Sequence, residues 1–199
     1  MSALDPAGPS AEAIARLWWV MLAGATLLLA LVLTLVGLTF ARKRTLARID
    51  GRTWVIGGGL VLPGVVLTAL IVFTLLTGER LLARPQEPGA VAMQAVASQF
   101  QWRFGPLDGD AQAGPLVIPA GVPVHVHVTS LDVIHSFWVP RLAGKIDAIP
   151  GHVNMIRIVA PAPGVYRGVC AEFCGVGHAV MPFVVEAVDP SDLGAEAGR

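Results

Sequence analysis

The residues best suited to chemistry lie close together near the C-terminal end of the chain. Cys170, Cys174, His178 and Met181 share one short stretch, and Cys170 and Cys174 are the only cysteines in the sequence. Thiolate, imidazole and thioether groups are soft or borderline metal ligands, and as a set they favour copper over hard cations. The stretch therefore predicts a copper site.

Three other uses of the two cysteines remain open at this point. A disulfide between Cys170 and Cys174 suits an oxidising compartment, but it leaves the positions of the nearby histidine and methionine unexplained. A structural zinc site with two cysteines and two histidines is possible by count, but it makes no use of Met181. A thiol–disulfide redox pair normally has two residues between its cysteines, whereas here the three residues Ala-Glu-Phe intervene.

His135 supplies a further candidate ligand from a distant part of the chain. A blue-copper centre uses one cysteine, two histidines and a weak methionine ligand, and that set is available as His135, Cys174, His178 and Met181. Cys170 is then an additional thiolate. If the chain makes one turn between the two cysteines, both thiolates face the same point and can hold two copper ions close together.

His125 and His127 alternate with valines, so both side chains are expected on one face of a strand. A pair of metal ligands is one interpretation of this pattern. Two histidines on the solvent-facing side of a strand is the other, and it is the commoner arrangement.

The composition indicates a membrane protein. Hydrophobic residues make up 54% of the 199 residues and charged residues 14%, and the mean hydropathy is +0.67. An ordinary soluble domain has roughly 25% charged residues. The formal net charge is zero, which gives no indication of a nucleic-acid partner.

Two runs without charged residues, 17–41 and 53–78, are each long enough to cross a bilayer as a helix. Trp18 and Trp19 begin the first run, where interfacial aromatic side chains are expected. The connection 42–52 is rich in basic residues, which the positive-inside rule places in the cytoplasm. The N-terminal lead 1–16 and the part after the second run are then expected on the outer side, which in a bacterium is the oxidising periplasm.

After a predicted linker, 79–89, the pattern changes to short apolar segments separated by turns that contain Gly and Pro. The predicted strands are 91–96, 100–104, 116–118, 122–128, 153–159, 165–169 and 182–188. Many short strands at this spacing are typical of a β-sandwich or barrel, which we expect over residues 90–188. No helix of useful length is predicted there, and residues 189–199 are expected to form a flexible tail.

The pattern Cys-x-Glu-x-Cys-x3-His-x2-Met with an upstream histidine resembles subunit II of cytochrome c oxidase, and the resemblance extends from about Trp18 to Val188. It implies a membrane hairpin of two transmembrane helices followed by an all-β, cupredoxin-like Greek-key sandwich or barrel. It also implies a dinuclear copper A centre. The implied copper ligands are His135, Cys170, Cys174, His178, Met181 and the backbone carbonyl of Glu172.

The same resemblance implies further sites and partners. The Glu172 side chain would reach a magnesium site shared with subunit I, and Lys145–Gly151 matches a family stretch near that interface. The chain would be an enzyme only as a subunit, accepting electrons from cytochrome c and passing them to haem in subunit I, where oxygen is reduced to water. The implied partners are subunit I, subunit III, cytochrome c and the lipid bilayer, and no nucleic acid. The implied location is the bacterial inner membrane, with the copper domain on the periplasmic side.

Docking of cytochrome c is expected to be electrostatic, because the family's donor presents a lysine-rich face. Nine acidic and six basic residues between Ala90 and Arg199 give this part a net charge of −3. The candidate docking residues, which resemble acidic family positions, are Asp108, Asp110 and Asp132.

Two departures from the family pattern bear on function. Phe100 stands where the family usually has the tryptophan that receives electrons, and Trp102 is the following aromatic residue. The second apolar run has no carboxylate at the mouth of a proton path. The alternatives are therefore a different electron donor or a copper A subunit of a related haem–copper complex, such as a nitric oxide reductase. A membrane-anchored copper-delivery or storage protein is another alternative, whereas a quinol oxidase subunit would lack the ligand set.

Overall fold

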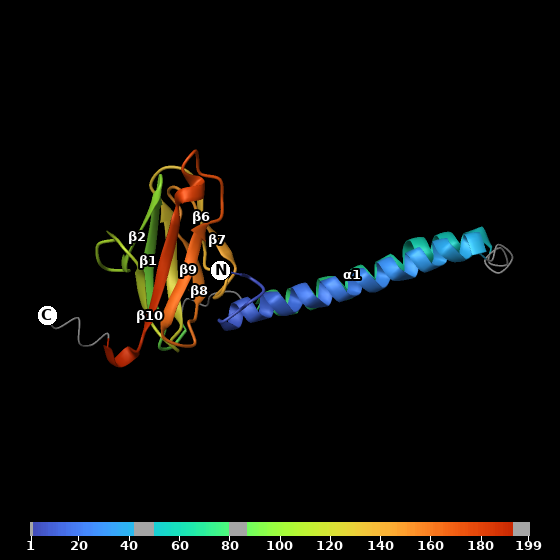
Figure 1. Cartoon of the computed structure of the whole chain (residues 1–199), viewed down its shortest axis with the longest axis horizontal. Coiled ribbons are helices and arrows are strands. Elements are labelled where there is room, and N and C mark those ends of the chain that lie inside the picture. Colours follow the sequence, from blue (N-terminus) through green and yellow to red (C-terminus); the bar gives the residue numbers. More distant parts are fainter. Residues whose placement is uncertain (1, 42–49, 80–86, 193–199) are drawn as a thin grey trace. The chain divides into compact units, whose positions relative to one another are not determined.

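The computed structural model describes residues 2–41, 50–79 and 87–192. The chain divides into two compact units, of which one contains Met1–Ala15 and Leu81–Arg199 and the other contains Arg16–Arg80 (Figure 1). The basic residues 42–49, most of the predicted linker and the end of the predicted tail lie outside the described residues.

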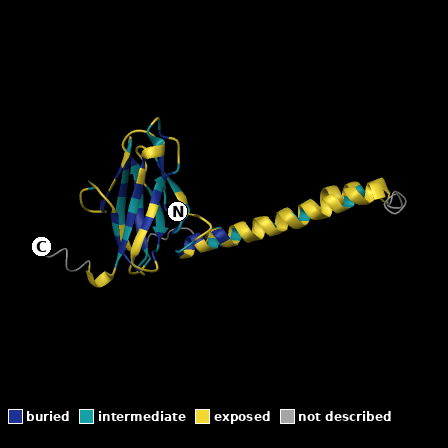
Figure 2. Cartoon of the chain, viewed as in Figure 1, coloured by how far each residue is buried: buried dark blue, intermediate teal, exposed yellow. Residues whose placement is uncertain are grey.

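Two long apolar helices are present, as predicted. The first is α1 (Pro9–Ala41), and the second consists of α3 (Gly51–Thr53), the π-helical η1 (Trp54–Val61) and α4 (Leu62–Glu79) in direct succession. Both are long and apolar enough to cross a membrane, with a mean hydropathy of 2.5 in each. Their side chains are largely exposed within the chain (Figure 2). Such a surface requires an apolar environment, because exposed apolar surface of this extent is unfavourable in water.

The N-terminal lead is more ordered than the sequence predicted, and α1 begins at Pro9, ahead of the charge-free run that starts at residue 17. The backbone N–H groups of Ala7 and Gly8 donate to the carbonyl of Arg141 at 2.8 and 2.9 Å. The Arg141 Nε in turn lies 3.1 Å from the Asp5 carboxylate. Proline is favoured at the first position of a helix because it has no N–H to leave unpaired. Docking against residues 141–142 therefore provides the reason for the early start.

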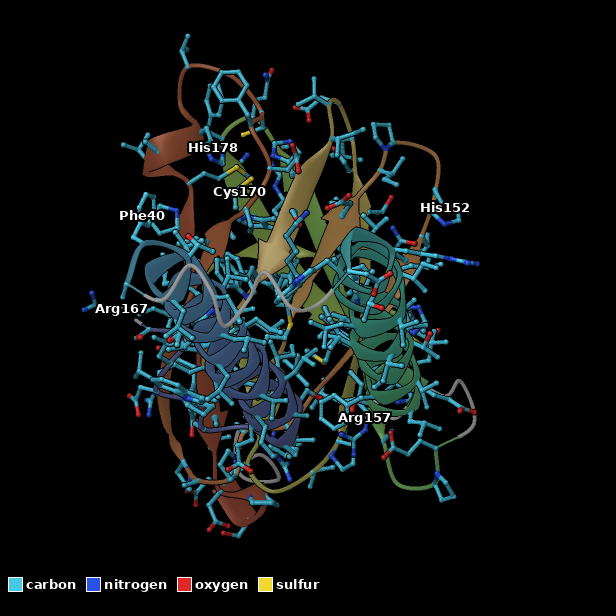
Figure 3. All side chains as sticks on the ribbon, turned by 90° about the vertical axis from the view of Figure 1, so that its right-hand side faces the viewer. Phe40, His152, Arg157, Arg167, Cys170 and His178 are labelled. Atoms are coloured by element: carbon cyan, nitrogen blue, oxygen red, sulfur yellow. The ribbon has the colours of Figure 1, made fainter. Side chains whose placement is uncertain are left out.

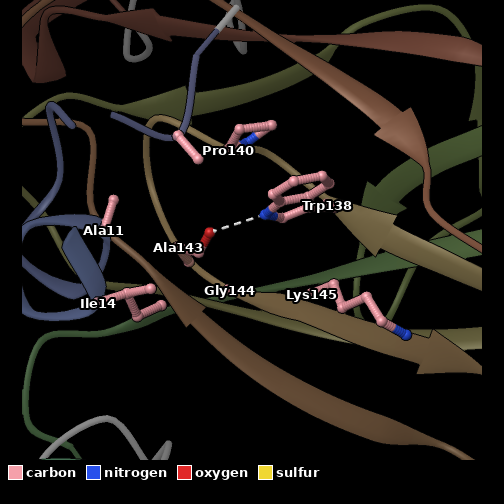
Figure 4. Close-up of a pocket in the computed structure, with 8 residues that line it drawn as sticks. Ala11, Ile14, Trp138, Pro140, Ala143, Gly144 and Lys145 are labelled. Carbon is pink, nitrogen blue, oxygen red and sulfur yellow. Dashed lines mark hydrogen bonds between the residues drawn. The ribbon is translucent and has the colours of Figure 1, made fainter. Parts of the chain in front are cut away.

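A small apolar pocket of about 180 Å³ lies where this lead meets the β-domain. Figure 4 shows Ala11 and Ile14 on one side, and Trp138 on the other with its Nε1 directed at the carbonyl of Ala143. That hydrogen bond is 3.2 Å long. Residues 3–14 thus pack against the β-domain as part of one unit.

The β-domain is a sandwich of two five-stranded sheets. The first sheet has the order β3-β2-β1-β5-β8, made of β3 (Gln112–Ala113), β2 (Gln101–Pro106), β1 (Val91–Ser98), β5 (Val124–Ser130) and β8 (Asn154–Ile158). Strands β1 and β5 run parallel, and the other neighbours in this sheet are antiparallel. The predicted strands of this sheet are confirmed, apart from shifts of one or two residues at their ends, and β3 is additional.

The second sheet has the order β4-β10-β9-β6-β7, made of β4 (Leu116–Pro119), β10 (Pro182–Val188), β9 (Gly164–Cys170), β6 (His135–Trp138) and β7 (Lys145–Ala148). Strands β10 and β4 are parallel, and the other pairs are antiparallel. The sequence did not predict β6 and β7. Three of the four residues of β6 are buried, so β6 lacks the polar–apolar alternation that marks a half-exposed strand.

An aromatic cluster fills the core between the sheets, and its members are Trp102, Phe104, Phe137 and Phe183. The rings of Phe137 and Phe183 are stacked with centroids 4.7 Å apart. A side chain at Gly168 would meet the Phe183 ring at 2.2 Å, so only glycine allows this approach. The cluster holds β2, β6 and β10 together directly beneath the end of the sandwich that carries the cysteines.

Glu87 fixes the start of the domain to the first sheet. Arg157 donates two hydrogen bonds from its Nε and Nη2 to this carboxylate, at 2.7 and 2.8 Å. His125 is buried and its Nε2 lies 3.0 Å from the same carboxylate. His125 therefore has a structural partner, and among the described residues neither His125 nor His127 belongs to a cluster of His, Cys and carboxylate side chains close enough to hold a metal.

Candidate metal centre

Strand pairing brings the distant histidine to the cysteine stretch. His135 is the first residue of β6, and Cys170 is the last residue of β9. The two strands are antiparallel, with Phe137 opposite Cys170. His135 therefore lies just beyond the end of β9, at the point where the chain enters the loop that carries the other candidate ligands. Figure 3 shows Cys170 and His178 together at one end of the sandwich, with Arg157 toward the other.

The two cysteines face each other without being bonded. Their Sγ atoms are 3.9 Å apart, whereas a disulfide requires about 2.05 Å. Both thiols are free and buried. Two thiols in contact, with no bond between them, match the predicted metal site rather than the disulfide alternative.

Each thiol contacts an imidazole of its own. The Cys170 Sγ lies 3.8 Å from Nδ1 of His135, and the Cys174 Sγ lies 3.7 Å from Nδ1 of His178. The Met181 Sδ is 3.8 Å from the Cys174 Sγ. The donor atoms of His135, Cys170 and Cys174 all lie within 4.8 Å of one another. The structure thus gathers all five side chains that the sequence nominated, with the thiols in the middle.

The Glu172 carbonyl also belongs to this group. Its oxygen lies 3.3 Å from the Cys170 Sγ. The Glu172 side chain points elsewhere, is about half exposed, and lies 3.6 Å from the Lys145 Nζ. Lys145 also pairs with Asp147 at 2.8 Å. The backbone carbonyl and the side chain of Glu172 therefore lie in two different places, and their roles toward copper and magnesium stay predictions.

Burial controls the protonation of the thiols. Cys174 is 4% exposed, and burial together with the adjacent Cys170 thiol raises the pKa of Cys174 to about 11. A metal bound by thiolates has to displace this proton, so metal binding releases protons and depends on pH. A buried, soft donor set of this kind fits a soft or borderline transition metal.

Asp132 orients the His135 ring. Its Oδ1 accepts a hydrogen bond from Nε2 of His135 at 2.9 Å, and its Oδ2 accepts one from the backbone N–H of Gln99 at 2.7 Å. Burial opposes ionisation of this carboxyl, but these hydrogen bonds outweigh it and lower the pKa of Asp132 to about 2. With Nε2 protonated, Nδ1 is free to act as a ligand.

Phe100 and Trp102 flank the centre from the first sheet. The Phe100 ring packs on the loop between Cys174 and His178, so closely that a side-chain carbon at Gly177 would lie 2.5 Å from it. Trp102 is buried, and its ring lies 6.2 Å from that of His135 in an edge-on arrangement. The half-buried Phe100 thus lies nearer the surface than Trp102, which is part of the core.

The three acidic residues nominated for docking lie in different places. Asp132 is at the metal centre, where His135 and Gln99 already use both of its oxygens. Asp108 and Asp110 are exposed in the turn after β2. That turn lies beside the start of β1, because Leu107 donates to the carbonyl of Ala92. Strand β1 separates it from the metal centre by roughly 20 Å at the usual rise per residue.

Gln99 is a residue near the centre that the sequence analysis did not single out. Its side-chain Nε2 donates to the carbonyl of Cys174 at 2.6 Å. A glutamine in a turn gives no signal of this role in one sequence. The link between Asp132 and His135 was detectable, because only two residues lie between this carboxylate and the candidate ligand histidine.

Comparisons with known proteins agree on one family. Residues 94–188 match the family described as cytochrome c oxidase subunit II, periplasmic domain. The chain is 33% identical to cytochrome c oxidase subunit 2 of Alkalihalophilus pseudofirmus over 98% of its own length and 60% of that protein. It is 50% identical to cytochrome c oxidase subunit 2 of Arabidopsis thaliana over 80 residues, which are 40% of this chain and 31% of that protein.

A solved structure described as a haem–copper terminal oxidase dimer contains a similar chain. The similarity has a TM-score of 0.52 and 28% identity, and it covers 66% of this chain and 98% of that one. The chain spans only about 60% of the length of the Alkalihalophilus relative. The matches nevertheless cover both the apolar helices and the sandwich with its cysteine loop, and over this length the chain is similar to cytochrome c oxidase subunit II.

Proposed function

We propose that this chain is the electron-transfer subunit of a respiratory haem–copper oxidase, with a dinuclear copper A centre in its β-domain. The observation that carries the proposal is the pair of unbonded thiols, 3.9 Å apart, each beside a separate imidazole. A site for one ion needs only one of these thiols. A second thiol in contact with the first, and a second imidazole on its far side, fit two ions.

The proposed ligands are His135, Cys170, Cys174, His178, Met181 and the Glu172 carbonyl. When bound, the copper pair supplies one-electron transfer between a donor such as cytochrome c and haem in subunit I, where oxygen is reduced to water. The chain contributes a buried site, because both thiols and the His135 ring are shielded from water. It also contributes a fixed His135 ring, which the Asp132 carboxylate holds in one orientation.

The surface around the centre is suited to partner subunits. An open concavity of about 510 Å³ lies beside it, lined by Val133, Ile134, Asp147, Glu172, Phe173, Cys174 and Gly175. Ile134 and Phe173 are exposed apolar side chains, with 47% and 76% of their surface accessible. Subunit I is the proposed partner at this face, with magnesium at the Glu172 side chain. Subunit III is a further partner of the assembled complex.

The proposed position of the electron donor is the side of the loop that carries Phe100. The half-buried ring packs on Gly175 and Gly177 of the loop that carries Cys174, so it offers a path through the protein from that surface to the centre. Trp102, on the adjoining strand β2, lies beside the His135 ring. The proposed location is the bacterial inner membrane with the β-domain in the periplasm, which agrees with two apolar helices and a family described as periplasmic.

The test uses the purified full-length chain in detergent. Titration with copper under mildly reducing conditions is expected to load two ions per chain and to give the spectrum of one unpaired electron shared by two coppers. Cys170→Ser is expected to bind one copper at most. His152→Ala, which removes an exposed histidine, is the control and is expected to load two.

A wild-type chain that binds one copper, or that prefers zinc, would contradict the dinuclear site. A separate measurement addresses the partner. A tag on this chain is expected to recover a haem-containing subunit from membranes of the source organism, and recovery of the chain alone from gently solubilised membranes would argue against an oxidase subunit.

A further inference from the structure

The turn between β1 and β2 contacts both segments that carry the proposed copper ligands. The Gln99 side chain donates to the carbonyl of Cys174 at 2.6 Å. The Gln99 backbone N–H donates to Asp132 at 2.7 Å, and Asp132 holds His135. One residue of the first sheet therefore links a ligand on the cysteine loop to a ligand on β6.

The cysteine loop has little other support on this side. Phe173 and Val176 are largely exposed, at 76% and 101% of their reference surface. Within the loop, the His178 N–H donates to the carbonyl of Gly175. The contacts between the loop and the rest of the domain include the hydrogen bond from Gln99 and the packing of the Phe100 ring on Gly175 and Gly177.

A rigid ligand frame matters for electron transfer, because atoms that stay in place on oxidation and reduction leave a smaller barrier. The carbonyl that accepts the Gln99 hydrogen bond belongs to Cys174, the residue that carries one of the two central thiols. Holding this peptide in place fixes the direction from which the Cys174 Sγ approaches the site, and with it the direction of the His178 segment four residues later.

We propose that Gln99 is a positioning residue for the copper centre, which holds the Cys174 peptide through its side chain and the Asp132–His135 pair through its backbone. This inference rests on the proposed function. It assigns to the side-chain amide a role that another side chain of the same length, without an N–H donor, cannot fill.

The test compares Gln99→Met with Gln94→Met in the full-length chain. Gln94 is a matched control, because its Nε2 also donates to backbone carbonyls, those of Pro106 and Gly109, at the opposite end of β1. Each variant is loaded with copper, and three quantities are measured: the copper hyperfine coupling in the EPR spectrum, the rate of copper release to a chelator, and the melting temperature of the copper-free chain.

Gln99→Met is expected to load two coppers, to show altered hyperfine coupling, and to release copper about fivefold faster, the factor that corresponds to one hydrogen bond of about 1 kcal/mol. Gln94→Met is expected to keep the wild-type spectrum and release rate. The copper-free melting temperatures of the two variants are expected to be similar, which separates positioning from general stability.

An unchanged spectrum and release rate in Gln99→Met would overturn the inference, as would equal changes in Gln94→Met. If Gln99→Met fails to fold, Gln99→Glu provides the same comparison, because a carboxylate at this position cannot donate to the Cys174 carbonyl. Failure of the wild-type chain to bind two coppers would instead count against the proposed function, so the two outcomes are distinct.

Discussion

Asp132 accepts a hydrogen bond from Nε2 of His135 at 2.9 Å, and Nδ1 of the same ring faces the Cys170 thiol at 3.8 Å. The carboxylate thereby selects which nitrogen of the ring is available to a metal. Carboxylates that hold ligand histidines in this way commonly raise metal affinity by 10- to 100-fold. Asp132 was nominated from sequence as a docking residue, but its oxygens are directed into the metal centre.

Asp132→Asn is therefore expected to weaken copper binding by roughly 10-fold or more. Both carboxylate oxygens act as acceptors, and asparagine replaces one of them with an NH2 group that would face an N–H donor. Copper affinity is measured by competition with a chelator. Asp110→Asn, at an exposed position in the turn after β2, is the control. Equal affinities in the two variants would show that the contact with His135 is unimportant for binding.

Docking of the N-terminal lead on the β-domain is expected to contribute to stability. A side-chain carbon at Gly8 would lie 2.6 Å from the carbonyl oxygen of Leu142 and 2.7 Å from that of Val159. Gly8→Ala should therefore lower the free energy of unfolding by about 1–3 kcal/mol, the usual cost of overpacking. Thermal unfolding of the full-length chain in detergent measures this effect.

Gly24→Ala is the matched control, because among the described residues, apart from the adjacent backbone of α1 itself, nothing lies within 4 Å of the added carbon. It is expected to leave the melting temperature unchanged or slightly raised, since alanine favours helix. A Gly8→Ala chain as stable as the control would contradict the docked arrangement of the lead.

The ion pair of Glu87 with Arg157 predicts a stability that depends on pH. Hydrogen bonds from Arg157, together with the nearby His125, lower the pKa of Glu87 from 4.5 to about 2 in the folded chain. The stabilisation is therefore fully present above pH 4.5 and is lost as the pH falls toward 2. Glu87→Gln should reduce the free energy of unfolding by about 1–2 kcal/mol at pH 7, and the difference from wild type should shrink between pH 4.5 and pH 2.

Chemical unfolding at a series of pH values measures this difference. Asp108→Asn, at an exposed carboxylate, is expected to change stability by less than 0.5 kcal/mol, roughly the limit for surface substitutions. If the difference in the free energy of unfolding between wild type and Glu87→Gln stayed constant down to pH 2, the charge of the Glu87 carboxylate would not contribute to stability.

The net charge of −3 between Ala90 and Arg199 predicts that a basic electron donor associates more slowly as salt rises. The rate of electron uptake from cytochrome c by the copper-loaded chain is measured at several ionic strengths. The double variant Asp108→Asn and Asp110→Asn should weaken this salt dependence if these exposed carboxylates steer the donor. A rate that does not change with ionic strength would exclude electrostatic docking for this chain.

Much of the molecule was predictable from the sequence because the features that identify its helices, strands and cysteine stretch lie between residues close together in the chain. The two charge-free runs predict two apolar helices, since helix length and hydropathy are local properties. The alternating strands β1 and β10 were likewise predictable, because each buries alternate side chains. The spacing between Cys170 and Met181 nominated four ligands through covalent connectivity alone.

The tertiary structure decided what the two sheets bring together. His135 reaches Cys170 only because β6 pairs with β9, and β6 itself is too short and too buried to be recognised by its pattern. Gln99 meets Cys174 across 75 residues of sequence. Residue types and local spacing thus determined which groups could bind metal. Long-range strand pairing and core packing decided which other residues position these ligands, because such contacts join residues far apart in the chain, which a local pattern does not contain.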